Sequence, residues 1–172
     1  MEWQTDILGD DYASCVFTAA GPDGVERTAT LVRHIPSAGA GPAPRRAVLF
    51  LHGWSDYFFN EELAEFWTGQ GFDFFALDMH NHGRSLEHGT HGGYVADLAD
   101  YDAEITAAMD IIASLHPKGS PPPPVTLMGH STGGLIAALW ASRHPGRAAQ
   151  LVLDSPWLEM HGSPAVRRAA RT

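Results

Sequence analysis

The sequence contains little cysteine and little lysine, and both shortages narrow what the protein can be. Cys15 is the only cysteine in 172 residues, so no disulfide can form within the chain. It lies in an apolar run, where we expect a small buried side chain rather than a reactive thiol. Only Lys118 is a lysine, and 11 basic residues face 20 acidic ones. With a formal charge of −9 and no basic cluster, a nucleic-acid partner is not expected.

Long apolar runs are also missing. None approaches the roughly 18–20 residues that span a bilayer, so no integral membrane segment is expected. The N-terminus has no basic segment leading into an apolar one, which argues against a secretory signal. A cytoplasmic location is therefore the default expectation. The hydrophobic share of 44% is enough for one domain with a sizeable core.

Strand and helix signals alternate along the chain. The sequence predicts strands at residues 12–19, 26–35, 47–51, 72–78, 125–128 and 151–153. The first two flank a run of turn-forming residues and suggest a hairpin. The strand at 47–51 is continuously apolar and the later ones are mostly apolar, which is typical of strands buried on both faces in a parallel sheet. This order predicts an α/β fold with helices covering the sheet.

Three helices are predicted between these strands. The first begins at a capping Asn60 and ends at Gly71. Phe59, Leu63, Phe66 and Gln70 recur along it at helical spacing. The second carries an apolar stripe over residues 98–115, and the third covers residues 132–144. Residues 37–46 and 80–93 are predicted to be a surface loop and a polar loop.

A serine lies between two glycines where a strand turns into a helix. Gly129, Ser131 and Gly133 fit the G-x-S-x-G pattern, with an apolar strand before them and a helix after them. A serine hydroxyl is a weak nucleophile, and such a turn holds it exposed and fixed. The pattern predicts Ser131 as a nucleophile. The alternative is a glycine-rich turn without chemistry.

An acyl-transfer site also needs N–H donors where negative charge develops. The residue after the nucleophile, Thr132, should supply one backbone N–H. The turn His52-Gly53-Trp54 follows an earlier buried strand, and we expect the N–H of Trp54 to be the second donor. A plain strand-ending turn is the alternative for His52 and Gly53.

Four segments in order, LFLHGWSDY, FALDMHNHGRS, LMGHSTGG and LVLDSPW, resemble the α/β-hydrolase superfamily. The resemblance is closest to serine aminopeptidase-type and monoglyceride lipase-like hydrolases. It implies a mostly parallel sheet with helices on both faces and hydrolysis of a carboxylic ester through Ser131. The family usually has Asp-x-Arg-Gly-His-Gly-x-Ser in its second segment, whereas His80 and Asn81 replace the Arg-Gly pair here. We expect this difference in the loop sequence to distinguish subfamilies more than to affect catalysis.

The resemblance also implies that parts of the enzyme are missing. In this fold the acid and then the histidine follow the nucleophile along the chain. His144 ends the helix after Ser131, and His161 comes too soon after Asp154 and Glu159 to reach it. We therefore expect the catalytic histidine to lie outside this chain. Asp154 is a possible acid, because some relatives place it at this strand end; its alternative role is to pack that end.

These expectations make residues 1–172 a single incomplete α/β-hydrolase domain, truncated after the strand that follows the nucleophile helix, without the cap and the C-terminal strands. Hydrolysis should then be weak or absent. The strand at residues 151–153 should form an exposed sheet edge, through which the chain can self-associate.

A metal site is a rival explanation. Four histidines cluster in the polar loop, and His-x-His is a possible ligand pair. They are His80, His82, His88 and His91. The loop lacks the aspartate and third histidine of a metallo-β-lactamase-type motif. Neither a metal nor another cofactor is expected.

Other functions remain open at this point. The fold can serve as a non-catalytic interaction module, or host an acyltransferase or a peptidase. The expected partner is a small-molecule acyl ester, such as a monoacylglycerol or a short acyl ester. An aromatic run forms either an apolar acyl pocket or the packing of the helix that follows. Its members are Trp54, Tyr57, Phe58 and Phe59.

Overall fold

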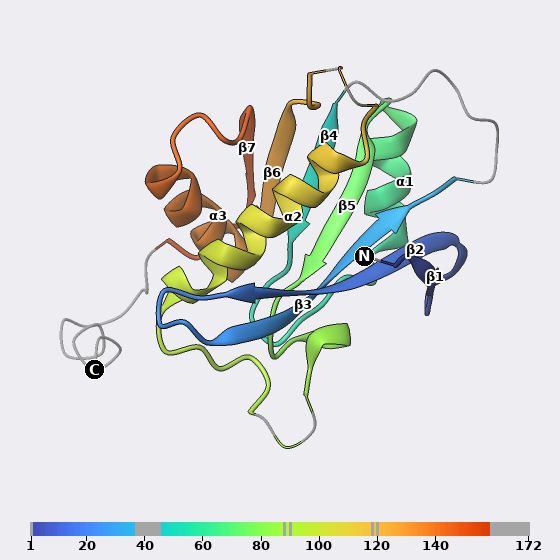
Figure 1. Cartoon of the computed structure of the whole chain (residues 1–172). Helices are drawn as coiled ribbons and strands as arrows, with labels where there is room; N and C mark the ends of the chain where they lie inside the picture. Colours follow the sequence, from blue (N-terminus) through green and yellow to red (C-terminus); the bar gives the residue numbers. More distant parts are fainter. Residues whose placement is uncertain are drawn as a thin grey trace.

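A computed structural model of the chain shows a seven-stranded sheet with helices on both sides (Figure 1). It describes residues 2–36, 46–87, 89, 91–117, 119 and 121–158. The strands are β1 (Gln4–Asp6), β2 (Gly9–Ala20), β3 (Glu26–His34), β4 (Ala47–Leu51), β5 (Asp73–Asp78), β6 (Val125–His130) and β7 (Gln150–Asp154). Their order across the sheet is β1-β2-β3-β5-β4-β6-β7.

The predicted hairpin is confirmed, since β2 and β3 pair antiparallel. The strands from β5 through β4 and β6 to β7 run parallel to one another, as the apolar runs predicted. Strand β1 was missed because three residues are too few to show an alternating pattern. The parallel strands bring the ends of β4 and β6 to the same edge of the sheet.

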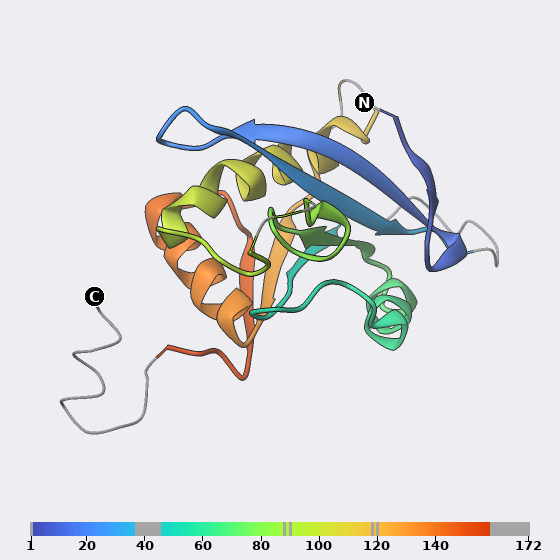
Figure 2. The ribbon, with the colours of Figure 1, turned by 90° about the horizontal axis from the view of Figure 1, so that it is seen from below.

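The helical elements are α1 (Glu61–Gly69), η1 (Gly83–Ser85), η2 (Leu98–Tyr101), α2 (Asp102–Ser114) and α3 (Thr132–Arg143). Helices α2 and α3 cover one face of the sheet and α1 covers the other (Figure 2). Strand β4 shows both cores. Leu49 and Leu51 pack on the side of α2 and α3, while Val48 and Phe50 pack on the side of α1. Burial on both faces explains why this strand is continuously apolar.

The boundaries of α1 were predicted well, but its buried face was not. The Asn60 side chain accepts a hydrogen bond from the Leu63 N–H at 3.1 Å, as a capping residue should. Phe66, however, is 58% exposed, and Phe59 is also exposed. Phe58 and Ala64 fill the core instead. Leu63 packs partly against this core, so the prediction holds there and is wrong for Phe59 and Phe66. The small Ala64 carries little hydrophobic signal.

Strand β7 is exposed, as expected for a sheet edge at residues 151–153. Its apolar run alone is typical of a strand buried on both faces, yet Leu151 is 40% exposed. Within the described part of the chain β7 pairs with β6 alone, which makes it the edge strand. Its exposure follows from that position.

Cys15 is fully buried, as predicted, and burial raises the pKa of its thiol. None of the helices in the described segments has the length and apolarity that crossing a membrane requires. Several predicted features lie outside the described residues: most of the loop at residues 37–46, Lys118, His88, Glu159 and His161.

Candidate active site

Ser131 occupies a sharp turn between β6 and α3. Its backbone angles are φ 54° and ψ −118°, which a non-glycine residue rarely adopts. Hydrogen bonds on both sides hold the turn. The Ser131 N–H donates to the Asp154 carbonyl at 3.0 Å, and the Ser131 carbonyl accepts from the N–H groups of Gly134 and Trp157. A strained residue held this firmly is a candidate functional position.

The two glycines of the pattern allow this turn to pack closely. A Cβ atom on Gly129 would lie 2.3 Å from the Gly133 carbonyl oxygen. One on Gly133 would lie 2.3 Å from the carbonyl oxygen of His52, at the end of β4. No real Cβ comes that close to a backbone oxygen. The glycines therefore let the first turn of α3 pack against the turn after β4.

The turn after β4 lies directly beside Ser131. A Cβ atom built on Gly53 would be 3.4 Å from the Ser131 Cβ and 3.6 Å from Nδ1 of His130. The two segments are far apart in sequence, and the parallel pairing of β4 with β6 brings them together. The structure thus joins the residues that the sequence singled out separately.

His52 is buried beneath this turn, with 1% of its surface exposed. Its Nε2 accepts the Met79 N–H at 3.2 Å, and Nδ1 lies 2.8 Å from the Gly53 carbonyl oxygen. Since a carbonyl only accepts, Nδ1 must carry the proton and donate it. Burial, followed by the proximity of His82, lowers the pKa of His52 to about 4. The ring is therefore neutral at physiological pH.

This hydrogen bond orients the next peptide group. In a trans peptide the carbonyl and the N–H point in opposite directions. The Gly53 carbonyl faces the His52 ring, so the Trp54 N–H faces away from it. Thr132 is the first residue of α3, and its N–H has no acceptor within the helix. The roles of the Trp54 and Thr132 N–H groups as oxyanion donors stay a prediction.

Asp154 meets Ser131 through its backbone carbonyl, whereas its side chain and that of His144 make other contacts. Asp154 ends β7 with an exposed carboxylate, which accepts a hydrogen bond from the Ser155 hydroxyl at 3.1 Å. The His144 ring stacks on Trp140 and lies 3.2 Å from the Asp102 carboxylate. His144 thus packs at the far end of α3, as the sequence suggested. No histidine in the described segments bonds to the Ser131 hydroxyl.

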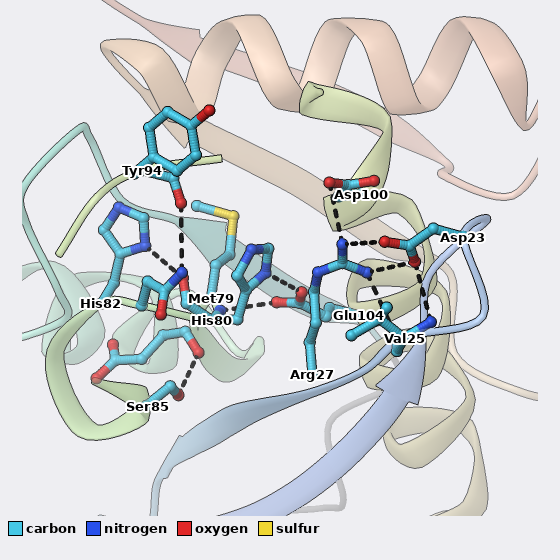
Figure 3. Close-up of polar contacts among 12 residues, drawn as sticks. Asp23, Val25, Arg27, Met79, His80, His82, Ser85, Tyr94, Asp100 and Glu104 are labelled. Carbon is cyan, nitrogen blue, oxygen red and sulfur yellow. Dashed lines mark hydrogen bonds and ion pairs between the residues drawn. The ribbon is translucent and has the colours of Figure 1, made fainter. Parts of the chain in front are cut away.

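The loop after β5 contains buried polar contacts that the sequence did not reveal (Figure 3). The His80 N–H donates to the Glu104 carboxylate at 2.9 Å, and Nδ1 of the His80 ring is hydrogen-bonded to the same carboxylate. Glu104 is fully buried in α2. The expected polar loop is therefore partly a core element, and the His80–Glu104 pair ties it to α2.

Asn81 and His82 continue this loop. Asn81 has φ 61°, a left-handed conformation that suits glycine and that asparagine tolerates. This explains how asparagine can occupy position 81, where the α/β-hydrolase pattern usually has glycine. Nδ1 of His82 donates to the His80 carbonyl at 2.8 Å, and burial lowers the pKa of His82. The loop is held by its own side chains.

Arg84 anchors the same loop to the sheet. It donates to both oxygens of Asp6 in β1, at 2.8 and 2.6 Å, and to Asp78 at 2.8 Å. Burial alone would raise the pKa of Asp6, but the hydrogen bonds and charge of Arg84 outweigh it, so this pKa is lowered. No sequence pattern links residues 78 positions apart. Only the fold could reveal this contact.

The proposed metal ligands do not converge. His80 and His82 use their Nδ1 atoms in the contacts above, and His88 lies outside the described residues. In the portion of the chain that is described, no three histidine, cysteine or acidic side chains come together. His80 and His82 serve packing and hydrogen bonding.

The aromatic run divides between the two roles considered for it. Phe58 is buried in the core beneath α1. Trp54 is 69% exposed, but its indole N–H donates to the Gly93 carbonyl at 3.0 Å. Tyr57 and Phe59 remain partly exposed. Core packing thus accounts for Phe58, whereas Trp54 borders the site.

A parallel sheet between helices, with a strained serine between β6 and α3, defines the α/β-hydrolase fold. The structure superposes on a peroxisomal α/β-hydrolase of Saccharomyces cerevisiae with a TM-score of 0.64 and 18% identity. That match covers 88% of this chain and 46% of the yeast chain. Residues 42–172 match the family model described as serine aminopeptidase, S33, and the chain belongs to this family.

Two curated relatives are similar over about two thirds of the chain. A monoacylglycerol lipase of Mycolicibacterium smegmatis is 29% identical over 119 residues, which cover 69% of this chain and 40% of the lipase. The human monoglyceride lipase is 33% identical over 114 residues, 66% of this chain and 35% of that enzyme. The chain thus spans less than half the length of either relative.

Proposed function

We propose that the chain carries the nucleophile and oxyanion hole of an esterase or lipase-type serine hydrolase. Ser131 is the nucleophile, and the N–H groups of Trp54 and Thr132 are the donors. The observation that carries the proposal is the strained Ser131 turn lying against Gly53, whose neighbouring peptide is oriented by His52.

The chemistry follows from these positions. The Ser131 oxygen attacks the ester carbonyl carbon, and the carbonyl oxygen gains negative charge. The two N–H groups stabilise that charge, each contributing about 3 kcal/mol. The alcohol then leaves and an acyl-serine remains, which water hydrolyses to the acid. The dipole of α3, with its N-terminus at Thr132, favours the same charge.

The proton of the Ser131 hydroxyl needs a base. Since no histidine ring in the described segments bonds to this hydroxyl, we propose that the chain alone hydrolyses esters only weakly. Small acyl esters are the proposed substrates, in keeping with relatives named monoacylglycerol lipase and monoglyceride lipase. Added imidazole can act as an external base, so it should accelerate the reaction.

Labelling with a fluorophosphonate tests this proposal. The Ser131 oxygen forms a bond to phosphorus, the P–F bond breaks, fluoride leaves, and the hydroxyl proton passes to imidazole. We expect slow labelling that imidazole accelerates and that Ser131→Ala abolishes. Ser142→Ala, at an exposed serine of α3, is the control and should label normally. If Ser131 stays unlabelled with and without imidazole, the chain is a non-catalytic module.

We also propose that β7 mediates self-association. Among the placed residues β7 pairs with β6 alone, and its exposed Leu151 marks an edge open for pairing with a second copy. Sedimentation should show a concentration-dependent dimer that Leu151→Lys weakens. A monomer at every concentration would refute this.

A further inference from the structure

Two cavities meet beside the proposed oxyanion hole. The smaller has a volume of about 40 Å³ and is lined by Trp54 and Thr132, the two residues that supply the donors. Its remaining walls are mainly apolar and include Met79, Val95, Leu98 and Ile136. A carbonyl group held by the two N–H groups would have this space next to it. The cavity is therefore placed to receive part of an acyl ester.

The larger space is a groove of about 680 Å³ between β1, β2 and the loop after β5. Its apolar lining includes Ile7, Val16, Tyr57 and Leu86. Binding sites for drug-sized ligands have volumes of roughly 300–1,000 Å³, and this groove falls in that range. His82 and Gly93 line both spaces. The groove and the small cavity are therefore neighbours that share a wall.

Trp54 completes this wall. Its indole N–H donates to the Gly93 carbonyl at 3.0 Å. A Cβ on Gly93 would lie 2.8 Å from the indole nitrogen, so glycine is needed for the ring to come this close. Trp54 lines the small cavity but not the groove. Its indole is held against Gly93, which lines both spaces, so Trp54 bounds the small cavity where it approaches the groove.

We propose that the small cavity binds the acyl group of the substrate and that Trp54 limits its length. A single water needs roughly 10–15 Å³ of such volume. The cavity of about 40 Å³ is far smaller than the neighbouring groove of about 680 Å³ and suits a short acyl group. The preferred substrates are esters of short acyl chains, and Trp54 is the residue that determines this specificity. This inference rests on the proposed role of Ser131.

The length limit depends on the Trp54 side chain, whereas the proposed oxyanion donor is its backbone N–H. Substitution of the side chain keeps that donor and removes the wall. Trp54→Ala should join the cavity to the groove and admit long chains. Trp54→Phe keeps a ring but loses the hydrogen bond to Gly93, so it should have an intermediate effect. Phe66→Ala, at an exposed aromatic of α1, is the matched control.

The test compares alkyl fluorophosphonates with a two-carbon and a twelve-carbon chain, each below its micelle concentration and with imidazole present. The unmodified chain should label at Ser131 at least about tenfold faster with the short probe, the scale on which hydrophobic pockets discriminate. Trp54→Ala should bring the two rates close together, and Phe66→Ala should leave their ratio unchanged. Circular dichroism confirms that each variant is folded.

Each outcome decides a different point. Equal rates for the two probes on the unmodified chain would overturn the length limit but leave Ser131 as the nucleophile. An unchanged ratio in folded Trp54→Ala and Trp54→Phe would show that Trp54 is not the wall. If neither probe modifies Ser131, the proposed function itself fails, and this inference fails with it.

Discussion

Nδ1 of His52 donates a hydrogen bond to the carbonyl of Gly53 at 2.8 Å. The bond connects a buried, neutral imidazole to the peptide group that lies beside Ser131. Because Nε2 of the same ring accepts the Met79 N–H, both ring nitrogens are occupied by the backbone. His52 is thus committed to holding the turn and is not free to act as the base for Ser131.

This arrangement makes the stability of the protein sensitive to acid. The pKa of His52 is about 4 in the folded chain, against 6.5 for a free side chain, because burial opposes its charge. Above pH 6.5 the ring is neutral in both states. Between pH 6.5 and 4 the unfolded chain binds a proton that the folded chain does not. The free energy of unfolding therefore decreases as the pH is lowered through this range, by up to about 3 kcal/mol.

Urea unfolding at several pH values checks this. His52→Gln should be less stable at pH 7, by about 1–3 kcal/mol, because buried backbone groups lose their partners. Its stability should then fall less steeply than that of the unmodified chain as the pH drops from 6.5 to 4. Parallel curves for the two proteins would contradict the account of His52.

Gly133 should not tolerate a side chain. A Cβ there would lie 2.3 Å from the His52 carbonyl oxygen and 2.4 Å from that of Leu51, so Gly133→Ala must push α3 away from β4. We expect a loss of about 1–3 kcal/mol from this overpacking. Gly69→Ala in α1 is the control, since nothing lies within 4 Å of its Cβ position. That variant should be unchanged or up to about 1 kcal/mol more stable. Thermal unfolding of both variants measures the difference. Equal changes in stability would refute the close packing of Gly133 against the end of β4.

The Ser131 turn and its neighbours could be predicted because their signals are local. Gly129 and Gly133 stand two residues from Ser131, and the apolar strands around them need no partner to be recognised. The contact of Arg84 with Asp6 and the burial of Glu104 could not be predicted. They join segments far apart in the chain, and a charged residue usually indicates a surface position. The buried face of α1 was missed since exposed aromatics outweighed a small alanine in the pattern.

Asn81 should accept glycine but not alanine. At φ 61° an alanine Cβ is strained, whereas glycine adopts this conformation freely. Both substitutions remove the 3.3 Å hydrogen bond from the Asn81 side chain to the Tyr94 carbonyl. Beyond that shared loss, Asn81→Ala should lower the free energy of unfolding by about 1 kcal/mol through backbone strain, and Asn81→Gly should not. Chemical denaturation measures both. An alanine variant as stable as the glycine variant would contradict the backbone assignment.

The buried Glu104 should be far more sensitive than its surface counterparts. Glu104→Ala removes the partner of the His80 ring and of the His80 N–H. Each buried donor left without its acceptor costs roughly 1–3 kcal/mol. Glu65→Ala, on the exposed side of α1, should change stability by less than about 0.5 kcal/mol. Similar unfolding midpoints for the two variants would show that the His80–Glu104 contact does not stabilise the fold.

The most direct test of the central claim is to follow the backbone amides of Trp54 and Thr132 by NMR while Ser131 is phosphonylated. The adduct places a phosphoryl oxygen where the oxyanion would form. We predict that both amide proton signals move downfield, as they do on forming a hydrogen bond, and that Ser131→Ala shows neither adduct nor shift. An adduct on Ser131 that leaves both amides unmoved would contradict the oxyanion hole, and the absence of any adduct would contradict the nucleophile.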